Sequence, residues 1–250
     1  MGATMTGTYR IAGMTVAVTS VFPDVHLLCA EYSTDDAPDL SVETTPADIE
    51  DEEARTRREY AREGLPAPEF PPCVSEYTAV YRKIAERMVE YDRVVFHGAC
   101  VAVDGQGYLF AAKSGTGKST HAALWCELLG ERAVNVNDDK PMLHVADGGV
   151  TVYGTPWTGK HRRGRNMAVP LGAVCLLERA AENHIEPVAR EQAYPTLVQQ
   201  TYRPRDAEGL ARTLTLIDRL ARGVPLYRLG CNMEISAAET AWNAMRGRGA

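Results

Sequence analysis

Hydrophobic residues recur with two different periods along the chain. At 74–91 they return every three or four positions, which is the period of an amphipathic helix. At 8–19 Thr, Val, Ile and Tyr are frequent and partly alternate with other residues, which predicts a strand. The most continuous apolar run, Leu171–Glu178, predicts a central strand of a sheet. Three further helical periods lie near the end of the chain, at about 190–200, 206–222 and 236–246.

The middle of the chain predicts short strands that are joined by tight turns. The β-rich segments 99–103 and 108–111 are separated by Asp104-Gly105-Gln106-Gly107, which is typical of a β-hairpin. A second hairpin is expected over 142–153, with Asp147-Gly148-Gly149 at its turn. Together with the helices, these strands predict an α/β (α+β) protein.

Polar residues dominate one part of the N-terminal region. The stretch Asp35–Glu53 holds nine carboxylates and no basic residue, which predicts a solvated, mobile loop leading into a polar helix at about 47–63. The Pro-rich segment Leu65–Pro72 then predicts a stiff spacer. We therefore expect two domains, a small acidic region of strands and helices at 1–90 and a larger domain at 91–250.

The net charge of the chain is −6, and it divides unevenly between these regions. Residues 1–90 carry 17 acidic and 8 basic side chains, whereas residues 91–250 carry 16 acidic and 19 basic ones. The overall acidity argues against a general nucleic-acid binder. The six cysteines form no CxxC pair, which is typical of reduced thiols, and no run of 18 apolar residues occurs. We expect a cytoplasmic protein with no nucleic-acid or membrane partner.

The most informative local motif is AKSGTGKST at Ala112–Thr120, which follows a predicted strand and opens a predicted helix at Lys118–Leu129. Glycines in such a loop let backbone N–H groups turn toward a phosphate, and the start of the helix adds the positive end of its dipole. The motif differs from GxxxxGK[ST] at Ala112, which stands in place of the first glycine. The residues predicted to bind the nucleotide are Ser114, Gly115, Thr116, Gly117, Lys118, Ser119 and Thr120.

The chemistry of the loop predicts a nucleotide with a bound Mg²⁺. Lys118 would reach the β- and γ-phosphates, and the Ser119 hydroxyl would bind Mg²⁺. The loop by itself does not separate kinase, GTPase and carboxykinase chemistry. It follows the return strand of a hairpin, however, which predicts a mixed sheet instead of the parallel sheet of an ordinary P-loop NTPase.

Three separated elements resemble the core of bacterial HPr kinase/phosphorylase. They are the pair His97-Gly98 before the hairpin, the loop Ser114–Ser119 and the pair Asp138-Asp139 after the next strand. The resemblance covers about 94–180 and implies a mixed, partly antiparallel sheet similar to the nucleotide domain of phosphoenolpyruvate carboxykinase. Residues 1–93 do not resemble the family's own N-terminal domain. The segment GTPWTGK is similar to that of short HPr-kinase-like proteins.

The resemblance implies that one carboxylate of Asp138-Asp139 acts as the base. Adjacent residues on an extended chain point in opposite directions, so one carboxylate could face Mg²⁺ and the other the acceptor, while a plain turn is the alternative. His97 would lie beside the phosphates or be a core histidine. The segment 155–166 is a basic loop over the phosphates or a solvated face. The catalytic candidates are His97, Lys118, Asp138, Asp139, Arg163 and Arg165, and the metal candidates are Ser119 and Asp139.

These observations predict an ATP- and Mg²⁺-dependent kinase that phosphorylates a hydroxyl of serine or threonine type, in a peptide or in a small molecule. The basic loop suits an anionic acceptor. Two alternatives remain open at this point. One is a nucleotide-binding adaptor without turnover, and the other is a carboxykinase-like enzyme for a small organic acid. Members of the resembling family often form oligomers, which leaves a homo-oligomer open.

Overall fold

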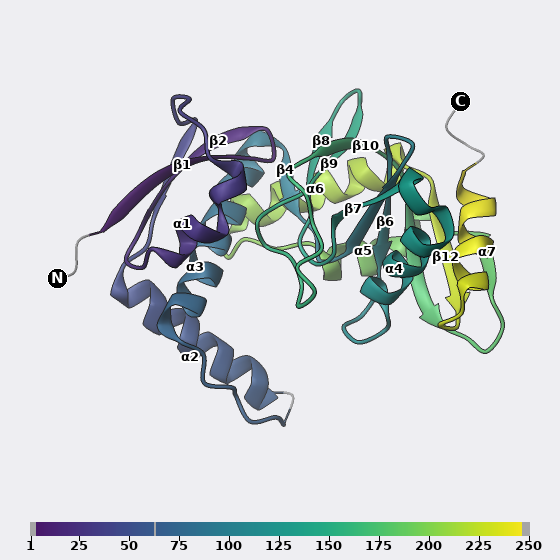
Figure 1. Cartoon of the computed structure of the whole chain (residues 1–250), viewed down its shortest axis with the longest axis horizontal. Helices are drawn as coiled ribbons and strands as arrows, with labels where there is room; N and C mark the ends of the chain where they lie inside the picture. The colour runs from purple at the N-terminus through teal and green to yellow at the C-terminus, as the bar shows by residue number, and fades with distance from the viewer. Residues whose placement is uncertain (1–3, 63, 247–250) are drawn as a thin grey trace. The chain divides into compact units, whose positions relative to one another are not determined.

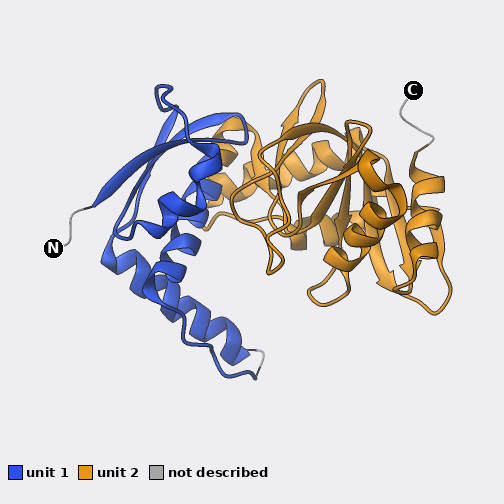
Figure 2. Ribbon diagram, in the orientation of Figure 1, with its two compact units in different colours: residues 1–87 blue, residues 88–250 orange. Residues whose placement is uncertain are grey.

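The structure, a computed structural model, describes residues 4–62 and 64–246. The chain divides into two compact units, Met1–Arg87 and Met88–Ala250, which Figure 2 shows in two colours. The boundary expected from charge, between residues 90 and 91, lies three residues further along the chain. Each unit has its own sheet.

The first unit consists of a three-stranded sheet with helices. Its elements are β1 (Met5–Ile11), β2 (Met14–Ser20), α1 (Asp24–Leu28), η1 (Ala30–Tyr32), β3 (Leu40–Glu43), α2 (Pro46–Arg62) and most of α3 (Pro72–Met88). The single strand expected at 8–19 is wrong, because β1 and β2 form an antiparallel hairpin there. Ala12 and Gly13 both have positive φ angles, 51° and 76°, and reverse the chain in two residues.

The acidic stretch also differs from the loop that was expected. Strand β3 lies within it and pairs in parallel with β2. Leu40 and Val42 are buried while Ser41 and Glu43 are exposed, so the strand buries one face of the sheet and keeps its charge on the other. The polar helix expected next is present as α2.

The second unit contains a nine-stranded mixed sheet (Figure 1). Its strands are β4 (Arg93–Val95), β5 (Ala99–Val103), β6 (Gln106–Ala111), β7 (Ala133–Asn137), β8 (Met142–Ala146), β9 (Gly149–Tyr153), β10 (Ala168–Arg179), β11 (His184–Pro187) and β12 (Leu226–Cys231). The order is β4-β8-β9-β10-β6-β5-β7, and β12 pairs with β10 and β11. Strand β10 is parallel to β6 and β12 but antiparallel to β9, and β5 is antiparallel to β6 and β7. The predicted mixed, partly antiparallel α/β fold is confirmed.

Helices cover both faces of this sheet. They are α4 (Lys118–Leu129), α5 (Arg190–Gln200), α6 (Ala207–Gly223) and α7 (Ile235–Met245), with the short helices η2 (Val89–Tyr91) and η3 (Gly130–Arg132). Alternate residues of β5 and β10 belong to two separate hydrophobic clusters, which therefore lie on opposite faces. Trp125 of α4 and residues of α7 pack in one cluster, and Leu197 of α5 and Ile217 of α6 pack in the other.

The buried strands place their polar neighbours at the ends of the sheet. Strand β6 leads directly into the loop before α4, and the residues after β7 are Asp138 and Asp139. Within the described ranges, no helix combines the length and the apolar character that are needed to cross a bilayer.

Candidate phosphate-binding site

Two glycines shape the backbone of the loop between β6 and α4, which is the loop predicted to bind phosphate. Gly115 and Gly117 have φ angles of 75° and 122°. Glycine adopts such positive φ angles readily, whereas residues with a Cβ atom rarely do. Gly117 is also the residue that caps the start of α4. Ala112 does not have a positive φ, so alanine can replace the usual first glycine there without backbone strain. The loop therefore keeps the two glycines that its backbone requires.

Lys118 lies inside this loop with its ammonium held by the backbone. The side chain is only 8% exposed, and Nζ donates to the carbonyl oxygen of Ala112 at 2.9 Å. Burial lowers the pKa of Lys118, because water no longer solvates the charge; nearby Asp139 raises the pKa in part. A phosphate in the loop would place a further anion beside this buried ammonium.

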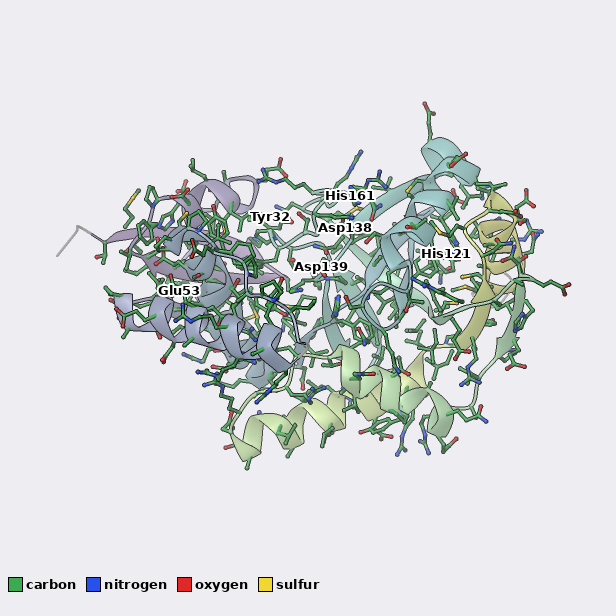
Figure 3. The ribbon with its side chains drawn as sticks, turned by 90° about the horizontal axis from the view of Figure 1, so that it is seen from below. Tyr32, Glu53, His121, Asp138, Asp139 and His161 are labelled. Atoms are coloured by element: carbon green, nitrogen blue, oxygen red, sulfur yellow. The ribbon has the colours of Figure 1, made fainter. Side chains whose placement is uncertain are left out.

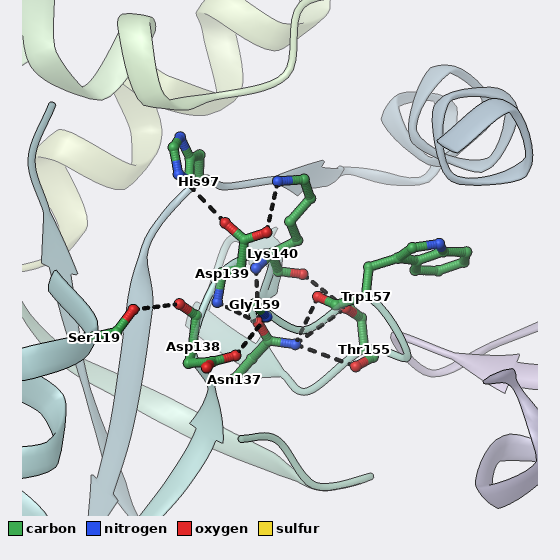
Figure 4. Close-up of polar contacts among 9 residues, drawn as sticks. All are labelled: His97, Ser119, Asn137, Asp138, Asp139, Lys140, Thr155, Trp157 and Gly159. Carbon is green, nitrogen blue, oxygen red and sulfur yellow. Dashed lines mark hydrogen bonds and ion pairs between the residues drawn. The ribbon is translucent and has the colours of Figure 1, made fainter. Parts of the chain in front are cut away.

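Asn137 forms the scaffold that positions the two aspartates (Figure 4). It is fully buried at the end of β7, and its Oδ1 accepts from the backbone N–H groups of Asp139 and Lys140 at 2.9 and 2.7 Å. Its Nδ2 donates to the carbonyl oxygens of Thr155 and Trp157 at 3.2 and 3.3 Å. One amide therefore joins the turn after β7 to the start of the basic loop.

The two aspartates have different surroundings. Asp138 is 2% exposed, and its Oδ1 accepts from the backbone N–H of Gly159 at 2.7 Å. Its Oδ2 is buried and has no hydrogen-bond partner among the described residues. Asp139, in contrast, uses both oxygens: Oδ1 lies 3.3 Å from Nε2 of His97, and Oδ2 accepts from Nζ of Lys140 at 2.9 Å. A buried carboxylate oxygen without a partner is costly unless a ligand uses it.

His97 lies beside Asp139 but carries no charge at neutral pH. Burial and the nearby Lys118 and Lys140 lower the pKa of His97 to about 4, and Asp139 only partly opposes them. The contact at 3.3 Å therefore joins the Asp139 carboxylate to a neutral imidazole. The adjacent Gly98 is required by space, since a Cβ there would lie 2.8 Å from the carbonyl oxygen of Phe110.

A cavity of about 460 Å³ brings most of the predicted site residues together. Figure 3 shows Asp138, Asp139 and His161 near one another. The cavity is lined by His97, Ser114, Gly115, Gly117, Lys118, Ser119, Thr120, Asp138, Asp139, Gly159, Lys160 and His161. The basic loop contributes Gly159, Lys160 and His161 to these described lining residues. Arg163 and Arg165 do not occur among them. The roles of those two arginines stay predictions.

The path of the basic loop explains this separation. The backbone N–H of Arg165 donates to the carbonyl oxygen of Val136 at 3.1 Å, and Gly164 forms a bridge with Asn137. Gly154 makes the return possible, because a Cβ there would lie 1.8 Å from the carbonyl oxygen of Arg165. The second half of the loop thus runs along β7, and the first half reaches the cavity.

The metal candidates fit Mg²⁺ by the chemistry of their donors. The Ser119 hydroxyl, which donates to the carbonyl oxygen of Asp138 at 3.3 Å, lines the same cavity as both aspartates. Mg²⁺ in such sites takes one or two carboxylates together with phosphate oxygens and water, so a cluster of three protein carboxylates is not needed.

Sequence reasoning missed two residues that hold the site, Asn137 and Gln200. With the nitrogen of its amide turned toward them, Gln200 donates to the carbonyl oxygens of His97 and Ala112 at 3.0 and 3.1 Å. Gln200 ends α5, which is far along the chain from both partners, so no local pattern indicates it. For Asn137 a weak signal existed, an amide directly before two aspartates at the end of an apolar strand.

We expect Asn137→Ala to lower the free energy of unfolding by about 2–4 kcal/mol, because it leaves two partly buried backbone N–H groups without their acceptor and removes a buried amide. Urea titration followed by circular dichroism measures this. Asn135→Ala is the matched control, since Asn135 lies two residues earlier on β7 and its buried Oδ1 has no partner. Equal losses in the two variants would contradict the scaffold role of Asn137.

The fold and this loop define an α/β protein in which a β-hairpin leads directly into a P-loop-type segment. The chain belongs to the ScmC family, because the model of SynChlorMet cassette protein ScmC matches residues 74–245. Among curated proteins, none matches the chain. Among solved structures, the Hpr(Ser) kinase/phosphatase from Coxiella burnetii is similar with a TM-score of 0.35 and 10% identity, over 61% of this chain and 99% of that one.

Proposed function

We propose that the protein is an ATP- and Mg²⁺-dependent phosphotransferase that phosphorylates a hydroxyl group. The observation that carries the proposal is a single cavity that combines Lys118, held inside a phosphate-type loop, with the carboxylate of Asp138, whose Oδ2 has no partner. Cations for phosphate and a carboxylate for an acceptor are the parts that phosphoryl transfer requires.

In the proposed reaction, the acceptor oxygen bonds to the γ-phosphorus while the bond from that phosphorus to the β,γ-bridging oxygen breaks and ADP leaves. Asp138 orients the acceptor hydroxyl and takes its proton. Lys118 and the N–H groups of the loop hold the phosphates, with Ser119 and Asp139 as the residues that would hold Mg²⁺. Mg²⁺ would neutralise the charge on the phosphate oxygens.

The loop at Gly159 controls access to the proposed base. Gly159 donates its N–H to Oδ1 of Asp138, and a Cβ on Gly159 would lie 3.3 Å from Oδ2. Movement of this segment would uncover Oδ2 for an acceptor. Lys160 and His161, which follow directly and line the cavity, suit an acceptor that carries a negative charge. A peptide side chain and a free small molecule both remain within this class.

The experiment is a transfer assay with [γ-³²P]ATP, Mg²⁺, and pools of hydroxyl-bearing peptides and small molecules. We expect labelled product with the wild-type chain, and none when Mg²⁺ is chelated. Titration calorimetry with ATP and Mg²⁺ runs in parallel. Binding without transfer to any acceptor and without hydrolysis would contradict the phosphotransferase and favour the adaptor. Absence of ATP binding would contradict the nucleotide site itself.

A further inference from the structure

A second cavity, of about 440 Å³, is also lined by residues of this loop. It shares Gly115, Gly117 and Thr120 with the cavity described above, so the two spaces meet at the loop. Its described lining residues are Gly115, Thr116, Gly117, Thr120, His121, Leu124, Leu177, Arg179, Ala180, Cys231, Asn232 and Met233. They come from the loop, from α4 and from the segments that follow β10 and β12.

The chemistry of this second cavity differs from that of the first. Leu124, Leu177 and Met233 give it apolar walls, and Arg179 already donates to the carbonyl oxygen of Gly115 at 2.5 Å. No carboxylate occurs among its described lining residues. Met233 is 75% exposed, which leaves a large flexible apolar side chain at the rim without burial. The walls of this cavity therefore suit an apolar group.

His121 adds an unused hydrogen-bond donor to the wall. The ring is 3% exposed, and its Nε2 accepts from Nε1 of Trp125 at 3.0 Å. Because the indole nitrogen of Trp125 can only donate, Nε2 of His121 carries no proton, and the single proton of the ring lies on Nδ1. That Nδ1 has no hydrogen-bond partner among the described residues. A buried donor without an acceptor is costly, and a ligand with lone pairs would relieve that cost.

We propose that the second cavity binds the nucleoside of the nucleotide, with the base between Leu124 and Met233 and its ring acceptors on the side of His121. The proposal rests on the proposed function, since it takes the phosphates to lie in the first cavity. Because the two cavities meet at Gly115 and Gly117, one ligand can lie across the loop with its phosphates on the polar side and its base on the apolar side. A base has the flat apolar faces and the ring lone pairs that these walls call for.

The experiment compares the affinities of Mg-ATP and of Mg²⁺ with inorganic tripolyphosphate, measured by titration calorimetry. Tripolyphosphate carries the phosphates without a nucleoside. The ratio of the ATP affinity to the tripolyphosphate affinity therefore reports on the second cavity alone. Met233→Ala should weaken ATP by about fivefold, and Ala180→Trp, which fills the cavity, by more than about tenfold. Neither variant should change the affinity for tripolyphosphate.

Leu27→Ala is the matched control, because Leu27 is an apolar residue of the first unit that is 74% exposed, close to the 75% of Met233. The thermal midpoint of each variant shows whether it is folded. An unchanged ratio in folded Met233→Ala and Ala180→Trp, with ATP still bound by the wild type, would overturn the nucleoside site and leave the proposed function standing. If the wild type bound neither ligand, the proposed function would fail, and the nucleoside site with it.

Discussion

Asp138→Asn is expected to reduce phosphoryl transfer by about 10³-fold, within the range that a general base contributes, while Mg-ATP affinity changes by less than about threefold. Asparagine has the same shape, so its Oδ1 can still accept from the N–H of Gly159. The substitution also removes the negative charge and replaces Oδ2 by an amide nitrogen. This breaks no hydrogen bond among the described residues, because Oδ2 has no partner there. The variant thus removes the proton acceptor and keeps the anchor of the loop.

Asp139→Asn is the comparison that assigns the roles of the two carboxylates. Asp139 already contacts His97 and Lys140, so its loss should weaken the positioning of Mg²⁺ and of the imidazole. We expect a smaller loss of transfer, which higher Mg²⁺ concentration partly restores. Initial rates with saturating acceptor and varied Mg²⁺ measure both effects. If Asp138→Asn kept more activity than Asp139→Asn, Asp138 would not be the base.

Local sequence patterns predicted the elements that build the loop. The hairpin of β5 and β6 follows from a turn signal between two β-rich segments, and α4 follows from the glycine loop and Lys118. These features depend on neighbours within a few residues, which a sequence shows directly. The strand β3 was missed because its four residues depend on parallel pairing with β2, more than twenty residues earlier.

The parts of the site that were not predicted depend on contacts between distant segments. Gln200 contacts His97 and Ala112 because α5 packs against one face of the sheet. Asn137 joins the turn after β7 to the start of the basic loop, which follows many residues later in the sequence. The basic loop shows the same limit. Its charges are visible in the sequence, but the bridge between Asn137 and Gly164 decides that Lys160 lies at the cavity and that the later arginines follow β7.

The charged residues of the site lie in an arrangement that the count of charges in the two regions did not show. Lys118 and Lys160 line the first cavity together with Asp138 and Asp139. The lysines that would bind an anion and the carboxylate that would take the proton therefore border the same space. His97 is uncharged at neutral pH and therefore adds no further cation to this cavity. Of the two lysines that line the cavity, Lys118 is the one whose ammonium is held inside the loop that would surround the phosphates.

Lys118→Ala is accordingly expected to weaken Mg-ATP binding by about 10- to 100-fold, because a charge-assisted hydrogen bond to phosphate contributes about 1.5–3 kcal/mol and the Lys118 ammonium is held inside the loop. The fold should survive the change. The carbonyl oxygen of Ala112, which loses the Lys118 bond, still accepts from Gln200 at 3.1 Å. Titration calorimetry with Mg-ATP measures the loss.

Lys113→Ala is the matched control for this prediction. It removes the same charge from the same loop, but Lys113 is exposed to solvent, where a single cation contributes little. We expect its ATP affinity to stay within about threefold of the wild type, as screening by salt implies. Similar losses in the two variants would mean that the loop attracts ATP by net charge alone. A large loss in Lys118→Ala only would mean that position inside the loop, and not charge, makes this lysine the phosphate ligand.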